Sequence, residues 1–176
     1  MSGDTQSLGM APSGAPRAAP TDINSGTGTW SGPAYDCMLL VEYCGGGAAG
    51  SSTSDATLCC GGKSSVLRRE WIKHTAGASY SYAVGAGGTS PGAGPGGDGG
   101  DTTFGSLPTA YGGKGGGVNP AIAGTYGPGF GEDSPWGRGG APSGAAANGN
   151  GAGGGGNLSG GSGGAGSGGK IRITEY

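Results

Sequence analysis

A short segment rich in glycine and proline holds the side chains of this sequence that are best suited to contact another molecule. The segment reads GTYGPGFGEDSPWGRGG, and its candidate contact residues are Tyr126, Phe130, Trp136 and Arg138, with Glu132 and Asp133 between them. Aromatic faces beside polar groups are a common means of gripping sugars and partner surfaces. Two arrangements remain open from the sequence: the rings pack over a sheet or between protomers, or they form an exposed binding tip.

The other reactive residue types form no recognisable catalytic or metal-binding pattern. The four cysteines, Cys37, Cys44, Cys59 and Cys60, contain no C-x2-C pair, which argues against zinc. We expect them to be reduced, small, buried residues, with a local disulfide as the alternative. The single histidine, His74, belongs to no nucleophile–base arrangement and is predicted to be a surface or hydrogen-bonded residue. The sequence therefore predicts no enzyme, no catalytic residue, no metal and no cofactor.

Two weaker motifs lead to the same conclusion. Gly62, Lys63 and Ser64 have the order that ends a phosphate-binding loop, but Thr57 stands where that loop requires its first glycine. The segment GGDGGDTTF fits one calcium β-roll repeat, an architecture that needs tandem copies. We therefore predict a polar turn there, with Asp98 and Asp101 in solvent.

The composition excludes a conventional hydrophobic core. Of 176 residues, 49 are glycine and 11 are proline, against an average glycine usage of about 7%. The net charge of −2 supplies neither the repulsion that keeps a chain expanded nor the basic stripe that nucleic acid requires. No run is apolar enough to span a membrane, and the first residues lack a secretory pattern, so we expect assembly in a cytosol.

Period-two alternation of apolar and polar residues predicts a few short antiparallel strands. It occurs in residues 35–43, 66–74, 80–84 and 170–174, and the last strand is expected to return and pair with the 35–84 sheet. Residues 1–33, rich in Ala, Pro, Ser and Gly, are predicted to be an extended arm or linker, followed by a glycine-rich domain at 34–176.

Glycine in segment 85–169 recurs at every third position in two runs, interrupted only by Pro91 in the first and Asn157 in the second. The first run holds residues 85, 88, 94, 97 and 100, and the second holds 151, 154, 160, 163, 166 and 169. Three residues per turn is the repeat of polyproline II, which makes no internal hydrogen bonds and must take partners from its neighbours. We therefore predict a mostly β base, formed by strands in 35–84 and 170–176, that carries packed polyglycine II-type helices, with little or no α-helix.

The order of these elements resembles the glycine-rich domain of tailed-phage tail proteins, both minor tail proteins and tail-fibre tip adhesins. The resemblance covers about residues 29–176, and its most specific pieces are YAVGAGG at 82–88, TFGSL at 103–107 and IRITEY at 171–176. It implies a virion component with a small β base and packed polyglycine helices. In the adhesin branch it also implies receptor binding through loops at the far end of the stack.

The expected function is a structural component of a phage virion, most simply a tail or tail-fibre protein that contacts a host-surface glycan or protein. Expected partners are copies of the chain, with a trimer favoured, and another virion protein docked by residues 1–33. The contact surface would comprise the Thr89–Pro95 loop and the four candidate residues. Alternatives are a capsid or neck decoration protein, an ice- or surface-binding glycine-rich protein, and a disordered polymer.

Overall fold

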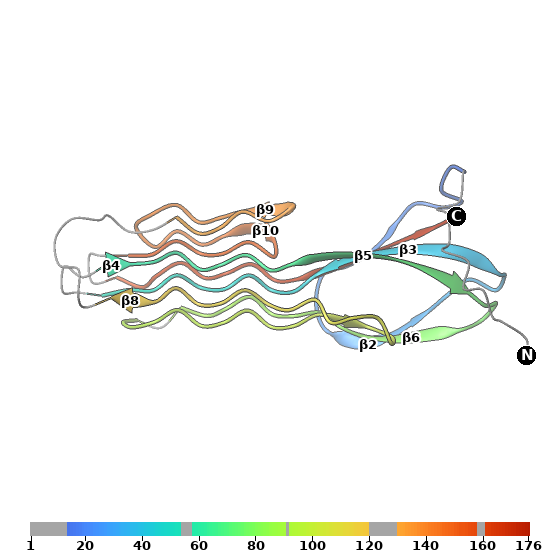
Figure 1. Ribbon diagram of the computed structural model, residues 1–176, viewed down its shortest axis with the longest axis horizontal. Coiled ribbons are helices and arrows are strands. Elements are labelled where there is room, and N and C mark those ends of the chain that lie inside the picture. The colour runs from blue at the N-terminus through green and yellow to red at the C-terminus, as the bar shows by residue number, and fades with distance from the viewer. Residues whose placement is uncertain (1–13, 54–57, 91, 120–129, 158–160) are drawn as a thin grey trace, which may run out of the picture.

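The protein is a rod with a β base at one end and a bundle of extended segments along the rest of its length (Figure 1). The computed structural model describes residues 14–53, 58–90, 92–119, 130–157 and 161–176. This part of the chain contains short antiparallel strands and no α-helix, so the predicted fold class is confirmed. It also contains no helix long and apolar enough to cross a membrane.

Two antiparallel sheets form the base. The four-stranded sheet has the order β1 (Thr21–Ile23), β11 (Lys170–Glu175), β3 (Cys37–Cys44), β5 (Leu67–His74). The three-stranded sheet has the order β2 (Thr27–Ser31), β6 (Ser79–Ala83), β7 (Thr103–Phe104). The pairing of β11 with β3 confirms that the C-terminal strand returns to the first sheet strand.

The core of the base lies between these two sheets. Alternate residues of β3 (Cys37, Leu39, Val41 and Tyr43) are buried, as the period-two pattern predicted. They form one cluster with Phe104, Ile171 and Ile173. Burying a large aliphatic or aromatic side chain contributes about 1.5–3 kcal/mol, so this small cluster is the main apolar contribution to folding.

His74 is a buried, hydrogen-bonded residue of this base. Its Nε2 lies 2.9 Å from the Pro33 carbonyl oxygen, which can only accept, so we assign the ring proton to Nε2. Its Nδ1 lies 3.0 Å from the Tyr80 hydroxyl oxygen and therefore accepts from it. Of the two arrangements predicted for His74, surface or hydrogen-bonded, the second is therefore the one observed.

The predicted boundary at residue 33 is wrong, because residues 21–31 belong to the base. β1 pairs with β11, and β2 pairs along its whole length with β6. These short strands carry too few apolar residues to be recognised by alternation, and their stability comes from the neighbours that they cover. An arm could only precede residue 21, and residues 1–13 lie outside the described part.

The glycine-rich segments pack around one central segment, residues 46–53. From residue 46 to residue 52, its successive backbone N–H groups donate to three different neighbours in rotation. The donors at 46, 49 and 52 bond to carbonyls at 100, 97 and 94; those at 47 and 50 bond to 167 and 164; those at 48 and 51 bond to 63 and 60. A direction that repeats every third residue is the geometry of polyglycine II.

Six segments surround the central one. They are 60–65, 85–89, 94–100, 113–117, 151–157 and 164–169, and we call the whole assembly the sheaf. The three remaining segments donate to carbonyls of the central one. These donors are the amides of Gly88, of Gly113 and Gly116, and of Gly154. Adjacent members of the ring also bond to one another, which closes it. Backbone pairing thus replaces an apolar core, as the sequence predicted.

The central segment itself was not foreseen. The strand predicted at 35–43 does end before the glycine cluster at 45–47, because β3 ends at Cys44. The chain then continues into the sheaf, where a Cβ on Gly46, Gly47 or Gly50 would lie less than 3.0 Å from a neighbouring carbonyl oxygen. Glycine is needed at these three positions because backbones approach closely there.

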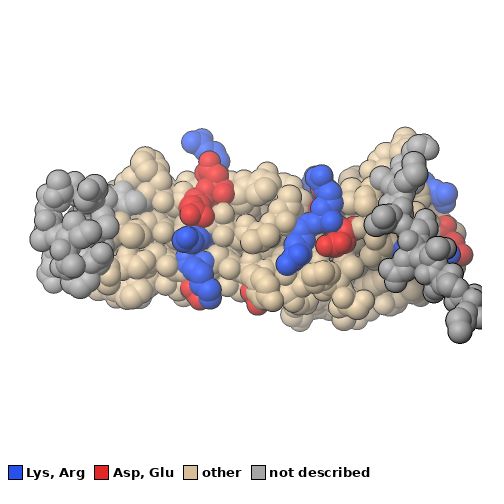
Figure 2. Space-filling model, in the orientation of Figure 1, with Lys and Arg blue, Asp and Glu red and all other residues tan. Residues whose placement is uncertain are grey.

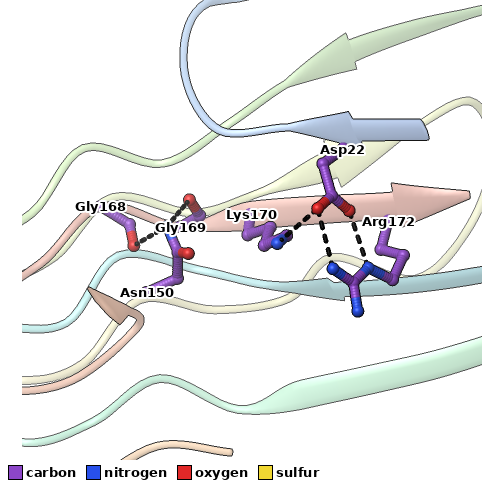
Figure 3. Close-up of polar contacts among 6 residues, drawn as sticks. All are labelled: Asp22, Asn150, Gly168, Gly169, Lys170 and Arg172. Carbon is purple, nitrogen blue, oxygen red and sulfur yellow. Dashed lines mark hydrogen bonds and ion pairs between the residues drawn. The ribbon is translucent and has the colours of Figure 1, made fainter. Parts of the chain in front are cut away.

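An ion-pair cluster lies near the junction between base and sheaf (Figure 3). The Asp22 carboxylate accepts from Nε and Nη2 of Arg172, at 2.7 and 2.8 Å, and from Nζ of Lys170 at 2.8 Å. These bonds, led by the one from Arg172, hold the pKa of Asp22 well below its usual range. The Asn150 side-chain amide donates to the carbonyls of Gly168 and Gly169. Polar side chains therefore tie β1, β11 and the sheaf together.

Candidate functional site

A shallow hollow on the side of the sheaf brings together part of the predicted contact segment. It encloses about 570 Å³ and is open to solvent. The lining residues are Phe130, Gly131, Glu132, Asp133, Arg138, Gly139 and Ala141. We call this surface the lateral hollow.

Backbone hydrogen bonds to the sheaf fix the walls of the lateral hollow. The amide of Glu132 donates to the Gly62 carbonyl, and the Glu132 carbonyl accepts from Gly153. Across the hollow, Gly131 donates to the Gly140 carbonyl at 2.8 Å. The next turn closes through β9 (Trp136–Arg138), which pairs with β10 (Asn148–Asn150). The hollow is therefore part of the bonded framework.

The side chains of the hollow offer both hydrogen-bond acceptors and a cation. An oxygen of Asp133 accepts from the Gly139 amide at 2.6 Å, and an oxygen of Glu132 accepts from the Ser64 amide at 3.2 Å. Among the described residues no ion pair engages Arg138, and its guanidinium is exposed. Phe130 is 73% exposed, which leaves its ring face open. Carboxylates, a guanidinium and a ring face suit a polar, hydroxyl-bearing ligand.

The structure divides the four predicted contact residues. Phe130 and Arg138 line the lateral hollow, whereas Trp136 does not. The Trp136 ring lies 5.7 Å from the Lys170 ammonium, near the junction with the base, an arrangement in which the cation faces the ring. Tyr126 lies outside the described residues.

The other lining residues were predicted only in part. Glu132 and Asp133 were expected beside the aromatic rings, and both line the hollow. Gly139 and Ala141 lie in the segment that follows β9, and its composition gives no sign of a contact surface. In the predicted Thr89–Pro95 loop, the Thr89 carbonyl accepts from Gly97 and Gly94 pairs with Ser52, while Pro91 is outside the described residues.

Charged side chains of both signs lie close together on the surface of the rod. Figure 2 shows Lys and Arg beside Asp and Glu in two groups across the rod, with mostly uncharged surface between them. Lys114 pairs with Asp98 at 2.7 Å, and this bond, with a second from the Gly115 amide, lowers the pKa of the Asp98 carboxyl. Asp101 accepts from the Gly112 amide. Both aspartates thus bond to backbone N–H groups on the outside of the sheaf and are exposed as predicted, but Asp98 lies in an extended segment of the sheaf and not in the predicted turn.

The cysteines and metal-ligating residues show no further site in the part of the chain that is described. All four cysteines are free; Cys37, Cys44 and Cys59 are buried and Cys60 is partly buried, as expected for small core residues. Burial raises the pKa of the Cys44 thiol. In the same residues no group of three or more His, Cys, Asp or Glu side chains could hold a metal ion.

The chain belongs to the glycine-rich domain family, whose model matches residues 21–175. The match begins at the first residue of β1, in agreement with the strands found before residue 33. Among curated proteins, no sequence matches this chain.

Proposed function

We propose that the protein is a structural component of a phage virion, most simply a tail or tail-fibre protein that presents the lateral hollow to a host-surface glycan or protein. The observation that supports this proposal best is the sheaf, in which a central segment bonds to six neighbours through its backbone. Such a bundle makes a stiff rod of small cross-section, and stiffness is what a virion appendage requires. The resemblance of its sequence to tail proteins points the same way.

The proposed contact surface combines chemistry suited to sugars with a rigid support. The Phe130 ring would stack on a sugar face, and Glu132, Asp133 and Arg138 would bond to its hydroxyl or acidic groups. Because the walls are bonded to the sheaf, little ordering entropy would be lost on binding. The proposed assembly is a symmetric oligomer, with a trimer favoured, formed in the host cytoplasm and joined to other virion proteins through residues before β1.

The experiment that tests this proposal is detection of the chain in purified particles. Mass spectrometry of gradient-purified phage should find it, and labelled antibody should place it on the tail. Intact particles without the chain would overturn the proposal. Label on the shell or neck would instead support a capsid or neck decoration protein.

One observation favours a second candidate, an ice- or surface-binding protein. The neighbouring segments 85–90, 161–169 and 141–147 contain no charged residue, so one flank of the sheaf presents only small residues and backbone. A thermal-hysteresis measurement on the purified protein decides between the two: ice-growth inhibition would favour this candidate, and none is expected for a tail protein.

A further inference from the structure

The open edge of strand β5 has the features of a peptide-binding surface. β5 is the last strand of the four-stranded sheet, and within the described ranges no strand pairs with its second side. It is eight residues long, as long as its partner β3, and contains neither proline nor glycine. Edge strands are usually shortened, bent or covered, because a long regular edge accepts further strands.

The register shows which backbone groups point toward this edge. Met38 and Tyr176 exchange two backbone hydrogen bonds, so Met38 directs its N–H and C=O toward β11. In an antiparallel strand the direction alternates, so Leu39 directs its groups toward β5, where it faces Ile72. Ile72 therefore bonds to β3, and the residues on either side of it direct theirs outward. The outward set is Leu67, Arg69, Trp71 and Lys73.

The side chains of this outward set lie together on the outer face of the sheet. Arg69 and Lys73 are exposed, and Trp71 between them packs against Tyr176 with ring centroids 4.9 Å apart. Arg69 contacts Glu42 but keeps 63% of its side chain exposed. A strand added to β5 would place residues of its own directly opposite these cations. Acidic residues four positions apart would complement them.

A second hollow lies at this edge, on the inner face. It measures about 180 Å³ and is lined by Ile72, Lys73, Tyr80, Phe104, Ser106 and Leu107. Ile72 points toward the inner face, as its pairing with the buried Leu39 shows. In an added strand, the residue opposite Ile72 would point to the same face. An apolar side chain there would fill the hollow.

We propose that the open edge of β5 binds an extended segment of a partner protein as an added antiparallel strand. Read from its N-terminus, the segment carries an acidic residue opposite Lys73, an apolar residue in the hollow beside Ile72, an apolar residue opposite Trp71, any residue, and an acidic residue opposite Arg69. Backbone bonds supply affinity, while the two cations and the hollow supply specificity. This proposal does not depend on the virion role.

A second copy of the chain fits this edge poorly. In one continuous sheet, two β5 strands related by a two-fold axis align residues of the same face. An axis at Arg69 or Glu70 places that residue opposite its own copy, and an axis at Trp71 places Arg69 opposite Lys73. An axis at Ile72 avoids these contacts but pairs only residues 70–74 of the two strands. Like charges directly opposite are destabilising. The charges therefore favour a partner with acidic residues.

The backbone part of the proposal is tested with the full chain and the capped peptide acetyl-Thr-Glu-Leu-Val-Thr-Glu-Thr-amide, by calorimetry. Its valine would lie opposite Trp71 and its leucine opposite Ile72. N-methylation of the valine should weaken binding at least about tenfold, because that N–H bonds to β5. N-methylation of the leucine, the matched control, should weaken it less than about threefold, because that N–H points away. Equal effects, or no binding up to about 1 mM peptide, would overturn the proposal.

The charge part is tested by exchanging signs. The double variant Arg69→Glu, Lys73→Glu should lose at least about tenfold in affinity for the peptide, and a peptide with lysine in place of both glutamates should recover it. Circular dichroism and the melting temperature check that the variant folds, and lysine-peptide binding shows that its edge is intact. If neither exchange changes the affinity, the proposal is contradicted. Peptide binding that dissociates an oligomer would identify a second copy as the occupant, and would also overturn it.

Discussion

At the scale of single residues, the space around each glycine controls whether the sheaf can close. Gly163 illustrates this, because a Cβ at this position would lie less than 3.0 Å from the carbonyl oxygen of Gly50 in the central segment. The obstructing atom belongs to the backbone of Gly50, whose amide donates to the Gly164 carbonyl, so it cannot move aside cheaply.

We expect Gly163→Val to destabilise the protein by about 3 kcal/mol, the upper range for overpacking. Chemical denaturation followed by circular dichroism measures the change. Ala165→Val is the matched control two residues away, because Ala165 is exposed, and it should change stability by about 0.5 kcal/mol or less. Equal tolerance of both substitutions would contradict close packing at Gly163.

Asp22 makes the free energy of unfolding depend on pH in the acid range. Its pKa is lowered in the folded state, chiefly by the bond from Arg172, so it binds a proton more readily when unfolded. Its contribution is complete above the unfolded pKa of about 3.9 and is lost as pH falls toward the folded value. We expect Asp22→Asn to cost about 1 kcal/mol at pH 7 and to flatten the loss of stability between about pH 5 and pH 2. Denaturation curves across this range test it; parallel pH profiles for the two proteins would refute the assignment.

At the scale of elements, the backbone and the side chains around β9 and β10 have different roles. The backbone is tied to the sheaf, whereas Phe130 and Arg138 project into the lateral hollow. Substituting these side chains should therefore leave β9 and β10 in place.

We expect Phe130→Ala and Arg138→Gln to leave the melting temperature within about 2 °C of the parent value. Each should reduce adsorption to host cells at least about tenfold if the hollow makes the contact. Adsorption is measured with particles carrying the variants. Wild-type adsorption by both would remove the lateral hollow from the proposed function without affecting the fold.

The sequence predicted the elements that have a strong periodic pattern. Strands β3, β5 and β11 follow from alternation, and residues such as Gly85, Gly88 and Gly154 stand where neighbouring backbones meet closely. β1 and β2 were missed because their stability depends on covering other strands, and residues 46–53 because a glycine cluster normally marks a turn. The lateral hollow was predicted only in part. Two of its lining residues, Gly139 and Ala141, have no side chain that would indicate a contact surface.

At the scale of the whole molecule, base and sheaf form one continuous structure. β3 runs directly into the central segment, and β6 into segment 85–89. Segments 60–65 and 164–169 lead into β5 and β11. The apolar core of the base thus holds the ends of several sheaf segments in register. This arrangement compensates for glycine, which loses more conformational freedom on ordering than any other residue.

Amide hydrogen exchange resolved by residue measures directly how firmly backbone bonds hold the sheaf. If backbone bonds hold the sheaf together, the amides of residues 46–51 should exchange as slowly as those of β3 and β11, although most of them belong to glycine or alanine. The amide of Gly26, which is exposed and donates to no group in the described part of the chain, serves as the fast reference. Exchange of residues 46–51 within seconds, while β3 and β11 remain protected, would contradict the central claim that main-chain pairing takes the place of a hydrophobic core.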